Sequence, residues 1–346
     1  MTSQPEPTPE PTAAPALDAE PKRNWADVAF QLGALLALVL LCIVLAIMSP
    51  AFLTTSNFAG LVGQTSYNAI LALGMLVVIL TGGIDLSIGA VLALAMVVLA
   101  KVITEGHVDQ SVGLLAALAV GAALGAANGL LLTRLHLPHP FISTLGMMNI
   151  ARGLALVITG GAAISALGGG IVKFIGNDEI KIGSGNGAVS IPYALFVVII
   201  AYVAFYIFLN RTVVGRHIYA TGGNPEAARL SGVPVDNILV LVYTISGLMA
   251  GLAAVVLAGR TDSGYPNAGL GFELDAISAC IIGGTSFFGG VGTVGGTLIG
   301  VLIMAVLRNG LNLLSVDTNV QTVIIGSVII AAVYVDVLRR RAGQAR

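Results

Sequence analysis

The chain has 346 residues, of which 56% are hydrophobic and only 10% are charged. Soluble proteins carry roughly 25% charged residues, so the composition excludes a water-soluble fold and indicates an integral membrane protein in a lipid bilayer. The formal net charge of -1 provides no basic surface, which excludes nucleic acid as a partner.

The chain begins with a polar segment, residues 1–24, that contains six prolines and few bulky apolar side chains. Such a segment cannot bury enough surface to offset the entropy lost on ordering, so we expect a disordered cytoplasmic tail. It lacks the basic start and apolar centre of a secretory signal. The next apolar run is therefore expected to remain as the first span of a transmembrane domain over residues 25–340, followed by a cytoplasmic tail at 341–346.

Ten apolar runs follow the tail, and a helix needs about 20 apolar residues to cross the hydrocarbon core. The eighth run is short and punctuated by glycine. The runs lie at 28–48, 58–80, 86–103, 112–132, 141–158, 191–209, 238–258, 276–288, 293–314 and 320–337. The sequence thus predicts an all-α membrane protein with about ten transmembrane helices.

The basic residues set the expected orientation, because Lys and Arg in short loops favour the cytoplasm. With the amino terminus inside, ten of them fall in cytoplasmic segments and four in outer loops. An even number of spans agrees with this distribution. Both termini are therefore expected in the cytoplasm.

Two glycine-rich breaks occupy similar places in the two halves of the chain: "TGGIDLSIGA" after the second span and "IGGTSFFGGVG" around the eighth. Repeats that start at spans two and seven are offset by five spans, so they would have opposite orientations. Inverted repeats are common in transporters, whose substrate path lies between them near broken helices. The alternative is that glycine only lets helices approach closely.

Several polar side chains fall inside or beside the predicted spans, where an unpaired polar group is costly. Amides and hydroxyls suit a ligand rich in hydroxyl groups. The candidates for a substrate path are Asn68, Asp85, Ser87, Asn128, Asn149, Asn309 and Asn312. Hydrogen bonding between helices is the alternative for the asparagines, and a helix N-cap is the alternative for Asp85. Arg308 lies deep enough to need a partner, and Arg152 would pair with a helix end or extend to the interface.

The sequence contains no recognisable catalytic machinery. It has no P-loop, no GxSxG nucleophile motif, and no histidine spacing suited to a metal, and Cys42 and Cys280 lie in apolar runs as packing residues. We therefore expect no catalytic residue, metal or cofactor on this chain. If ATP drives its action, a separate subunit must bind ATP and Mg²⁺.

The cytoplasmic loop at 210–237 contains "NPEAARLSG", which has the signals of a short amphipathic helix. Asn224 is the expected N-cap, Pro225 the first helical residue, Glu226 lies near the positive helix end, and Gly232 ends the helix. Ala227, Ala228 and Leu230 would form a shallow apolar surface, with Arg229 as a polar anchor, suited to docking on another protein. A solvated connector is the alternative.

The chain resembles the permease subunits of sugar-importing ABC transporters, the ribose, xylose, arabinose and galactose group. Five stretches in family order, covering about 57–336, carry the resemblance: "TGGIDLSIGA", "PFISTLGMMNIARGLALVITGG", "GRHIYATGGNPEAARLSGV", "ELDAISACIIGGTSFFGGVGTVGGTLIGV" and "NGLNLLSV". Phe287 and Phe288 depart from the family pattern.

The resemblance implies an ABC importer permease fold of the vitamin-B12/ribose type, two permease copies or a close paralogous pair, a cytoplasmic ATPase and a periplasmic sugar-binding protein. It makes residues 222–232, which include Gly222 and Gly223, the coupling helix that docks on the ATPase. It also implies that the outer stretch 264–275 contacts the binding protein and that the sugar passes along the central path. The competing hypotheses are an ion- or proton-coupled secondary transporter without an ATPase and a membrane scaffold that transports nothing.

Overall fold

The computed structural model describes residues 25–183 and 189–344, and their side chains over 33–183 and 189–338. The expected tail at 1–24 and the last two residues of the expected tail at 341–346 lie outside the described residues.

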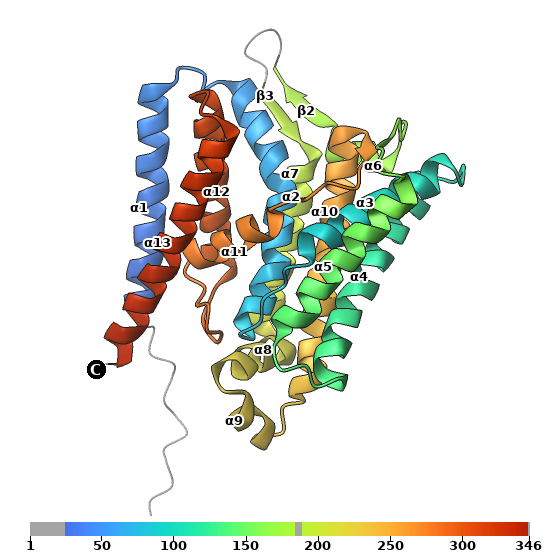
Figure 1. Ribbon diagram of the computed structural model, residues 1–346. Helices are drawn as coiled ribbons and strands as arrows, with labels where there is room; N and C mark the ends of the chain where they lie inside the picture. The colour runs from blue at the N-terminus through green and yellow to red at the C-terminus, as the bar shows by residue number, and fades with distance from the viewer. Residues whose placement is uncertain (1–24, 184–188, 345–346) are drawn as a thin grey trace, which may run out of the picture.

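The described chain is a helical bundle whose long helices run roughly side by side (Figure 1). The helices are α1 (Trp25–Met48), α2 (Thr55–Leu80), α3 (Ile88–Thr104), α4 (Gln110–Arg134), α5 (Pro140–Thr159), α6 (Ile171–Gly176), α7 (Tyr193–Arg211), α8 (Val213–Gly223), α9 (Pro225–Leu230), α10 (Val235–Thr261), α11 (Phe272–Ile282), α12 (Val294–Leu313) and α13 (Thr318–Gln344). The strands are β1 (Ile164–Ser165), β2 (Glu179–Ile182), β3 (Val189–Pro192) and β4 (Ser263–Gly264).

Two short antiparallel strand pairs, β2 with β3 and β1 with β4, were not predicted. The β2–β3 pair lies at one end of the bundle, which we name the hairpin end, and α9 lies at the opposite end, which we name the α9 end (Figure 1). Helix α13 also ends at the α9 end.

Seven helices of the described chain are long and apolar enough to cross a membrane: α2, α4, α5, α7, α10, α12 and α13. The prediction of an all-α multi-pass membrane protein is confirmed. The count of ten is not established, because α3 and the described apolar part of α1 are shorter and α11 has only 11 residues.

The eighth expected span, 276–288, is wrong in its bounds. Helix α11 covers 272–282, and the chain then leaves the helical conformation until α12 begins at Val294. Gly284, Gly289 and Gly290 have positive φ angles there, a conformation that glycine adopts without steric cost.

The core of the bundle lies around α2 and α3. Their residues 69–80 and 88–97 are buried without interruption, because α10 packs against both helices while α4 and α5 cover α3. Small residues allow the closest approach: a Cβ on Gly121 of α4 would overlap the backbone at Gly247 of α10, and the reverse also holds. Direct contact between helix backbones is a common way to pack helices in a bilayer.

The helix contacts of the two halves correspond as an inverted repeat predicts, but the two glycine-rich breaks do not: the first precedes α3, whereas the second, at 283–293, follows α11. Helix α3 packs on α4 and α5, and α11 packs correspondingly on α12 and α13; α10 packs on α4 as α2 packs on α12. The short helices α3 and α11 also begin at the same place, since a Cβ on Gly89 would overlap Gly269 and a Cβ on Gly269 would overlap Gly89. In Figure 1, α2 runs toward the α9 end and α10 away from it.

Candidate functional site

Helices α8 and α9 and the residues beside them, 212–234, lie at the α9 end of the bundle (Figure 1), and we name them the coupling segment after the role expected from the sequence. The side chain of Asn224 accepts the backbone N–H groups of Glu226 at 3.1 Å and Ala227 at 3.0 Å, and Pro225 is the first residue of α9. Gly232 follows the helix with a φ of 83°. The helix predicted from these capping signals is confirmed, and most of the expected loop at 210–237 is helical.

The outward surface of α9 differs in part from the prediction. Glu226, Ala227 and Arg229 are exposed, and Leu230 is 91% exposed. Ala228 is only 5% exposed, so its expected place on the docking surface is wrong: it lies on the inward face of a helix this short. Gly223 is exposed and Gly222 is half-buried.

Two polar contacts lie at the ends of the coupling segment. Arg229 forms an ion pair with Asp236 in the first turn of α10, and Thr212 caps α8 by accepting the N–H of Gly215 at 3.0 Å. A cleft of about 550 Å³ separates α9 from the turn at 81–83. Helix α9 thus stands away from the bundle over this cleft and is joined to it through α8 and α10.

The first helix break holds three predicted path residues together. Asp85 Oδ1 accepts the N–H of Ser87 at 2.9 Å and its hydroxyl at 2.6 Å, and Asp85 Oδ2 accepts the hydroxyl of Ser246 at 2.7 Å. Asn128 donates to the Ser87 hydroxyl at 2.8 Å. All four side chains are at most 1% exposed. Ser87, rather than Asp85, occupies the N-cap position of α3, but Asp85 accepts a backbone N–H as the capping alternative requires.

A second polar cluster joins α2, α11 and α12. Arg308, which was expected to need a partner, donates to Asp275 at 2.6 Å. Asn68 Oδ1 and Arg308 Nε are buried and have no hydrogen-bond partner among the described residues. Both residues line a cavity of about 20 Å³, a volume that accommodates roughly one water molecule.

The remaining path candidates lie elsewhere. Asn309 exchanges two hydrogen bonds with Asn57 of α2, at 2.8 and 3.1 Å, and Asn312 accepts one from Gln321 at 2.9 Å. Asn149 is exposed and donates to its own helix at Leu145. Hydrogen bonding between helices therefore accounts for Asn309 and Asn312 in this conformation.

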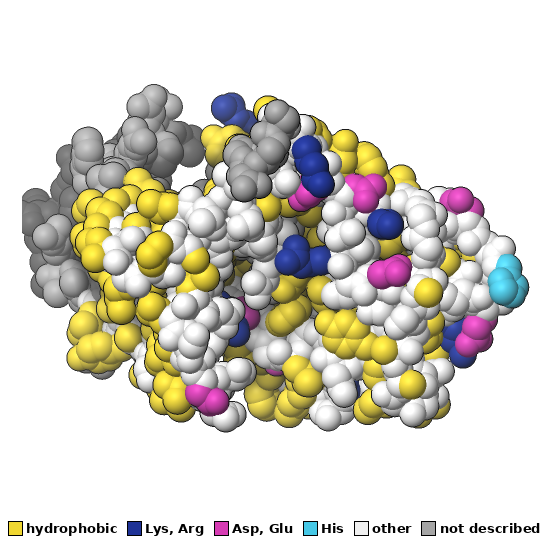
Figure 2. All heavy atoms as spheres, turned by 90° about the horizontal axis from the view of Figure 1, so that it is seen from above, with side chains coloured by type: hydrophobic (Ala, Val, Ile, Leu, Met, Phe, Trp, Pro, Cys, Tyr) yellow, Lys and Arg dark blue, Asp and Glu magenta, His cyan; other side chains and the backbone are white. Residues whose placement is uncertain are grey.

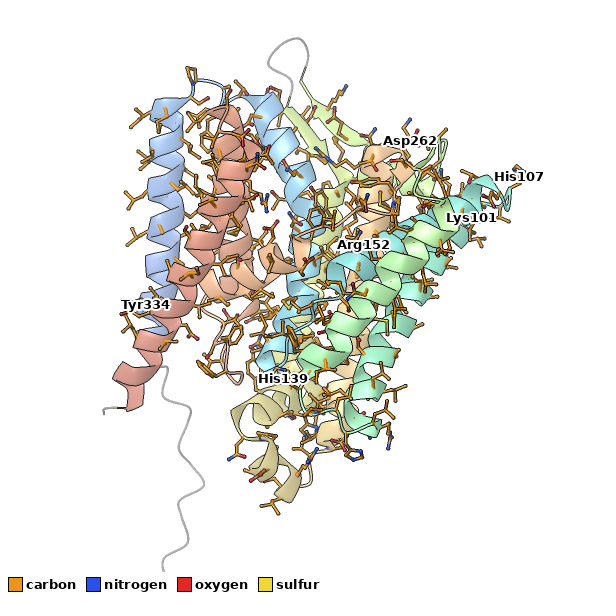
Figure 3. All side chains as sticks on the ribbon, viewed as in Figure 1. Lys101, His107, His139, Arg152, Asp262 and Tyr334 are labelled. Carbon is orange, nitrogen blue, oxygen red and sulfur yellow. The ribbon has the colours of Figure 1, made fainter. Side chains whose placement is uncertain are left out.

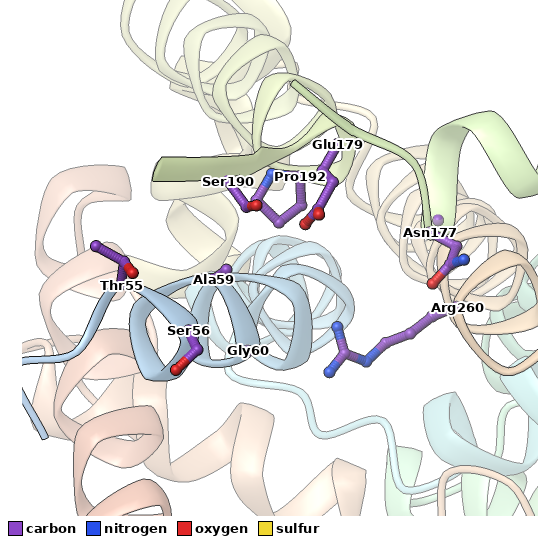
Figure 4. A pocket seen from close by; sticks show the side chains of 10 residues that line it. Thr55, Ser56, Ala59, Gly60, Asn177, Glu179, Ser190, Pro192 and Arg260 are labelled. Carbon is purple, nitrogen blue, oxygen red and sulfur yellow. The ribbon is translucent and has the colours of Figure 1, made fainter. Parts of the chain in front are cut away.

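The hairpin end carries polar and charged side chains. Figure 2 views this end and shows basic and acidic groups on it, with apolar side chains around its edge. A cleft of about 370 Å³ opens there between α2, α6, the β2–β3 pair and the end of α10 (Figure 4). Its polar lining consists of Thr55, Ser56, Asn177, Glu179, Ser190 and Arg260.

The turn that leads into α11 is held by Arg152. This side chain extends from α5 (Figure 3) and donates to the carbonyl oxygens of Pro266 and Ala268, each at 2.6 Å. The sequence left open whether Arg152 pairs with a helix end or extends to an interface; it binds the backbone just before α11.

Sequence reasoning missed Ser246, Asp275 and Asn57 as members of these clusters. Ser246 is an ordinary residue of an apolar helix, and nothing local distinguishes it. The triplet Asn-Gly-Leu, at 128–130 in α4 and again at 309–311 in α12, marks two of the predicted candidates but points to none of these three residues.

Comparison with known proteins gives a consistent result. Residues 57–333 match the family model described as branched-chain amino acid transport system, permease component. The chain is 42% identical to the ribose import permease protein of Escherichia coli K12 over 303 residues, which are 87% of this chain and 92% of that protein. It is 42% identical to the ribose import permease protein of Bacillus subtilis over 92% of this chain and 97% of that protein.

A further relative is the D-allose transport system permease protein of Escherichia coli K12, which is 40% identical over 88% of this chain and 90% of that protein. No solved structure matches the chain significantly.

Proposed function

The chain belongs to the family of branched-chain amino acid transport system permease components, and from this membership we propose that it is the membrane subunit of an ATP-driven sugar importer. The named relatives import ribose or transport D-allose, so a monosaccharide is the proposed cargo class rather than an amino acid. The cargo enters the cytoplasm of a bacterium across its inner membrane, and both termini are cytoplasmic.

The coupling segment is the observation that carries this proposal. The sequence has no P-loop, so the ATP and Mg²⁺ required for active transport must be bound by a partner ATPase. Leu230 is 91% exposed at the tip of a capped helix beyond the bundle. Burying one leucine side chain on a partner stabilises the complex by about 1.5–3 kcal/mol, so this residue is the proposed apolar anchor of the ATPase contact.

The hairpin end is the proposed site for the periplasmic sugar-binding protein. The charged groups on it suit a transient, electrostatically guided encounter. Arg152 holds the adjacent turn before α11, which belongs to the stretch 264–275. Contact with a partner at this turn would therefore act directly on the start of α11.

The two inverted halves suit alternating access, in which the substrate path opens to one side of the membrane at a time. In this conformation the Asp85 cluster is closed to solvent. A second copy of this chain, or a close paralogue, is the proposed partner that completes the path. Asn68, Asp85, Ser87, Asn128, Asn149, Asn309 and Asn312 remain the candidates for its lining.

The test is co-purification followed by transport. The permease is expressed with a candidate ABC ATPase and sugar-binding protein of the same organism, purified, and reconstituted into liposomes for ATP-driven uptake of radiolabelled pentoses and hexoses. Leu230→Asp should insert normally but lose the ATPase, because it buries a charge in the contact. Leu135→Asp is the matched control, since Leu135 is 64% exposed at the same end of the bundle but outside the coupling segment.

An ATPase should accompany the wild-type chain and the Leu135 variant. A wild-type permease that purifies without an ATPase, yet transports a sugar on an ion gradient, would instead establish a secondary transporter.

A further inference from the structure

Four glycines bring three separate parts of the chain into backbone contact at the α9 end. A Cβ on Gly222 of α8 would overlap Leu80 O and lie 2.7 Å from Gly290 N. A Cβ on Gly289 would lie 2.8 Å from Gly82 N and 2.9 Å from Gly222 O. We name this contact of Gly82, Gly222, Gly289 and Gly290 the glycine junction.

Two hydrogen bonds fasten the junction. The N–H of Gly290 donates to Leu80 O at 2.9 Å, which joins the loop after α11 to the end of α2. The hydroxyl of Tyr219 in α8 donates to Gly292 O at 2.9 Å, which joins the same loop to the coupling segment. Burial raises the pKa of Tyr219, so its hydroxyl stays protonated and remains a donor.

The glycine junction includes residues of two non-helical segments of the chain. The turn at 81–83 leads into the Asp85 cluster and the start of α3. The loop at 283–293 connects α11 to α12, and the side chain of Asp336 in α13 accepts the N–H of Phe287 at 3.2 Å. A single helix of the coupling segment therefore contacts non-helical segments from both repeats.

Contacts of this kind transmit displacement well. Side chains can absorb a shift by changing rotamer, but the backbone atoms in contact at a glycine have no such freedom, and packed interiors are poorly compressible. Two buried hydroxyls beside the junction, on Thr221 and Thr285, have no hydrogen-bond partner within the described chain. A shift of α8 therefore breaks no hydrogen bond made by these two groups.

We infer that the glycine junction is the point at which movement of the coupling segment reaches both repeats, with Gly222 and Tyr219 as its positioning residues. The inference rests on the proposed function, because it presumes that an ATPase moves the coupling segment. Displacement of α8 shifts the turn at 81–83 and the loop at 283–293 together, so α3 and α11 change position in the same step.

The experiment uses the complete transporter in liposomes and measures ATPase association, ATP hydrolysis and sugar uptake for each variant. Gly222→Ala places a methyl group against Leu80 O and separates the parts of the junction. Tyr219→Phe removes one hydroxyl and keeps the ring. Gly295→Ala is the matched control, because Gly295 lies two residues after the loop, in the first turn of α12, and no described atom outside its own turn of helix lies within 4 Å of its added Cβ.

The expected result is that Gly222→Ala retains the ATPase but transports less sugar per ATP hydrolysed, by roughly tenfold, within the range typical of coupling between sites. Tyr219→Phe should reduce the same ratio by a smaller factor, and Gly295→Ala should leave it unchanged. If Gly222→Ala fails to insert into the membrane, the uptake per ATP of Tyr219→Phe alone tests the inference.

The inference would be overturned if Tyr219→Phe, and any Gly222→Ala protein that inserts, kept the wild-type ratio of sugar uptake to ATP hydrolysis with the ATPase still bound. Failure of the proposed function has a different signature: the wild-type chain itself would then bind no ATPase and show no ATP-driven uptake.

Discussion

The ion pair between Arg308 and Asp275 offers a quantitative test of the second polar cluster. Arg308→Met removes the guanidinium and leaves the Asp275 carboxylate, whose side chain is 6% exposed, without its cationic partner. Loss of one partner from a fully buried pair costs about 3–5 kcal/mol. The Arg308 side chain is 33% exposed, so the pair is not fully enclosed by protein, and we expect a smaller destabilisation of about 2 kcal/mol.

The two partners should respond unequally. Asp275→Asn leaves an arginine whose long side chain is less enclosed than Asp275 and can extend toward the membrane interface, so its expected cost is lower, about 1 kcal/mol. The double variant should lose about 1 kcal/mol less than the sum of the single variants, because each single change already removes the shared interaction. The assay is unfolding of the purified protein in increasing SDS, followed by helical circular dichroism. Strictly additive losses, or a larger loss in Asp275→Asn than in Arg308→Met, would refute this account of the pair.

Three further variants test the coupling segment and the path. Asn224→Ala removes the acceptor that caps α9, so the helix should lose about 1 kcal/mol and the ATPase should bind more weakly, whereas Asn224→Asp should preserve binding; equal affinities for the two variants would exclude the cap as the cause. Glu226→Arg should insert normally but hydrolyse ATP without uptake, since it reverses charge on the docking surface, and normal uptake would count against that role. Asn309→Leu should change sugar uptake kinetics while the ATPase stays associated; unchanged kinetics would leave Asn309 as a packing partner of Asn57.

Helix α9 was predictable because its signals are local. Asn224, Pro225 and Gly232 each act on backbone groups within a few residues, and their effect does not depend on the rest of the fold. The long apolar helices were predictable for a similar reason, since the bilayer alone dictates their length and composition.

The partners within the bundle could not be predicted from local signals. Arg308 lies 33 residues after Asp275, and Asn57 lies 252 residues before Asn309, so only the packing of whole helices brings them together. The end of the eighth expected span failed for another reason. Its residues are apolar enough for a helix, but the glycines after Ile282 adopt positive φ angles that end it.

The positions of the non-helical segments mean that no single long element is needed to carry a displacement of α8 across the membrane. The turn at 81–83, which contacts α8 at the glycine junction, leads directly to α3, and the start of α3 is in backbone contact with the turn before α11 at Gly89 and Gly269. Arg152 holds that same turn. A displacement of α8 thus has a continuous route, by backbone contacts and one short helix start, from the α9 end to the segment proposed to meet the binding protein. Because the start of α3 contacts the turn before α11, a shift of the turn at 81–83 changes the packing at the start of α11 as well, which is the linked movement that the proposed alternating access requires.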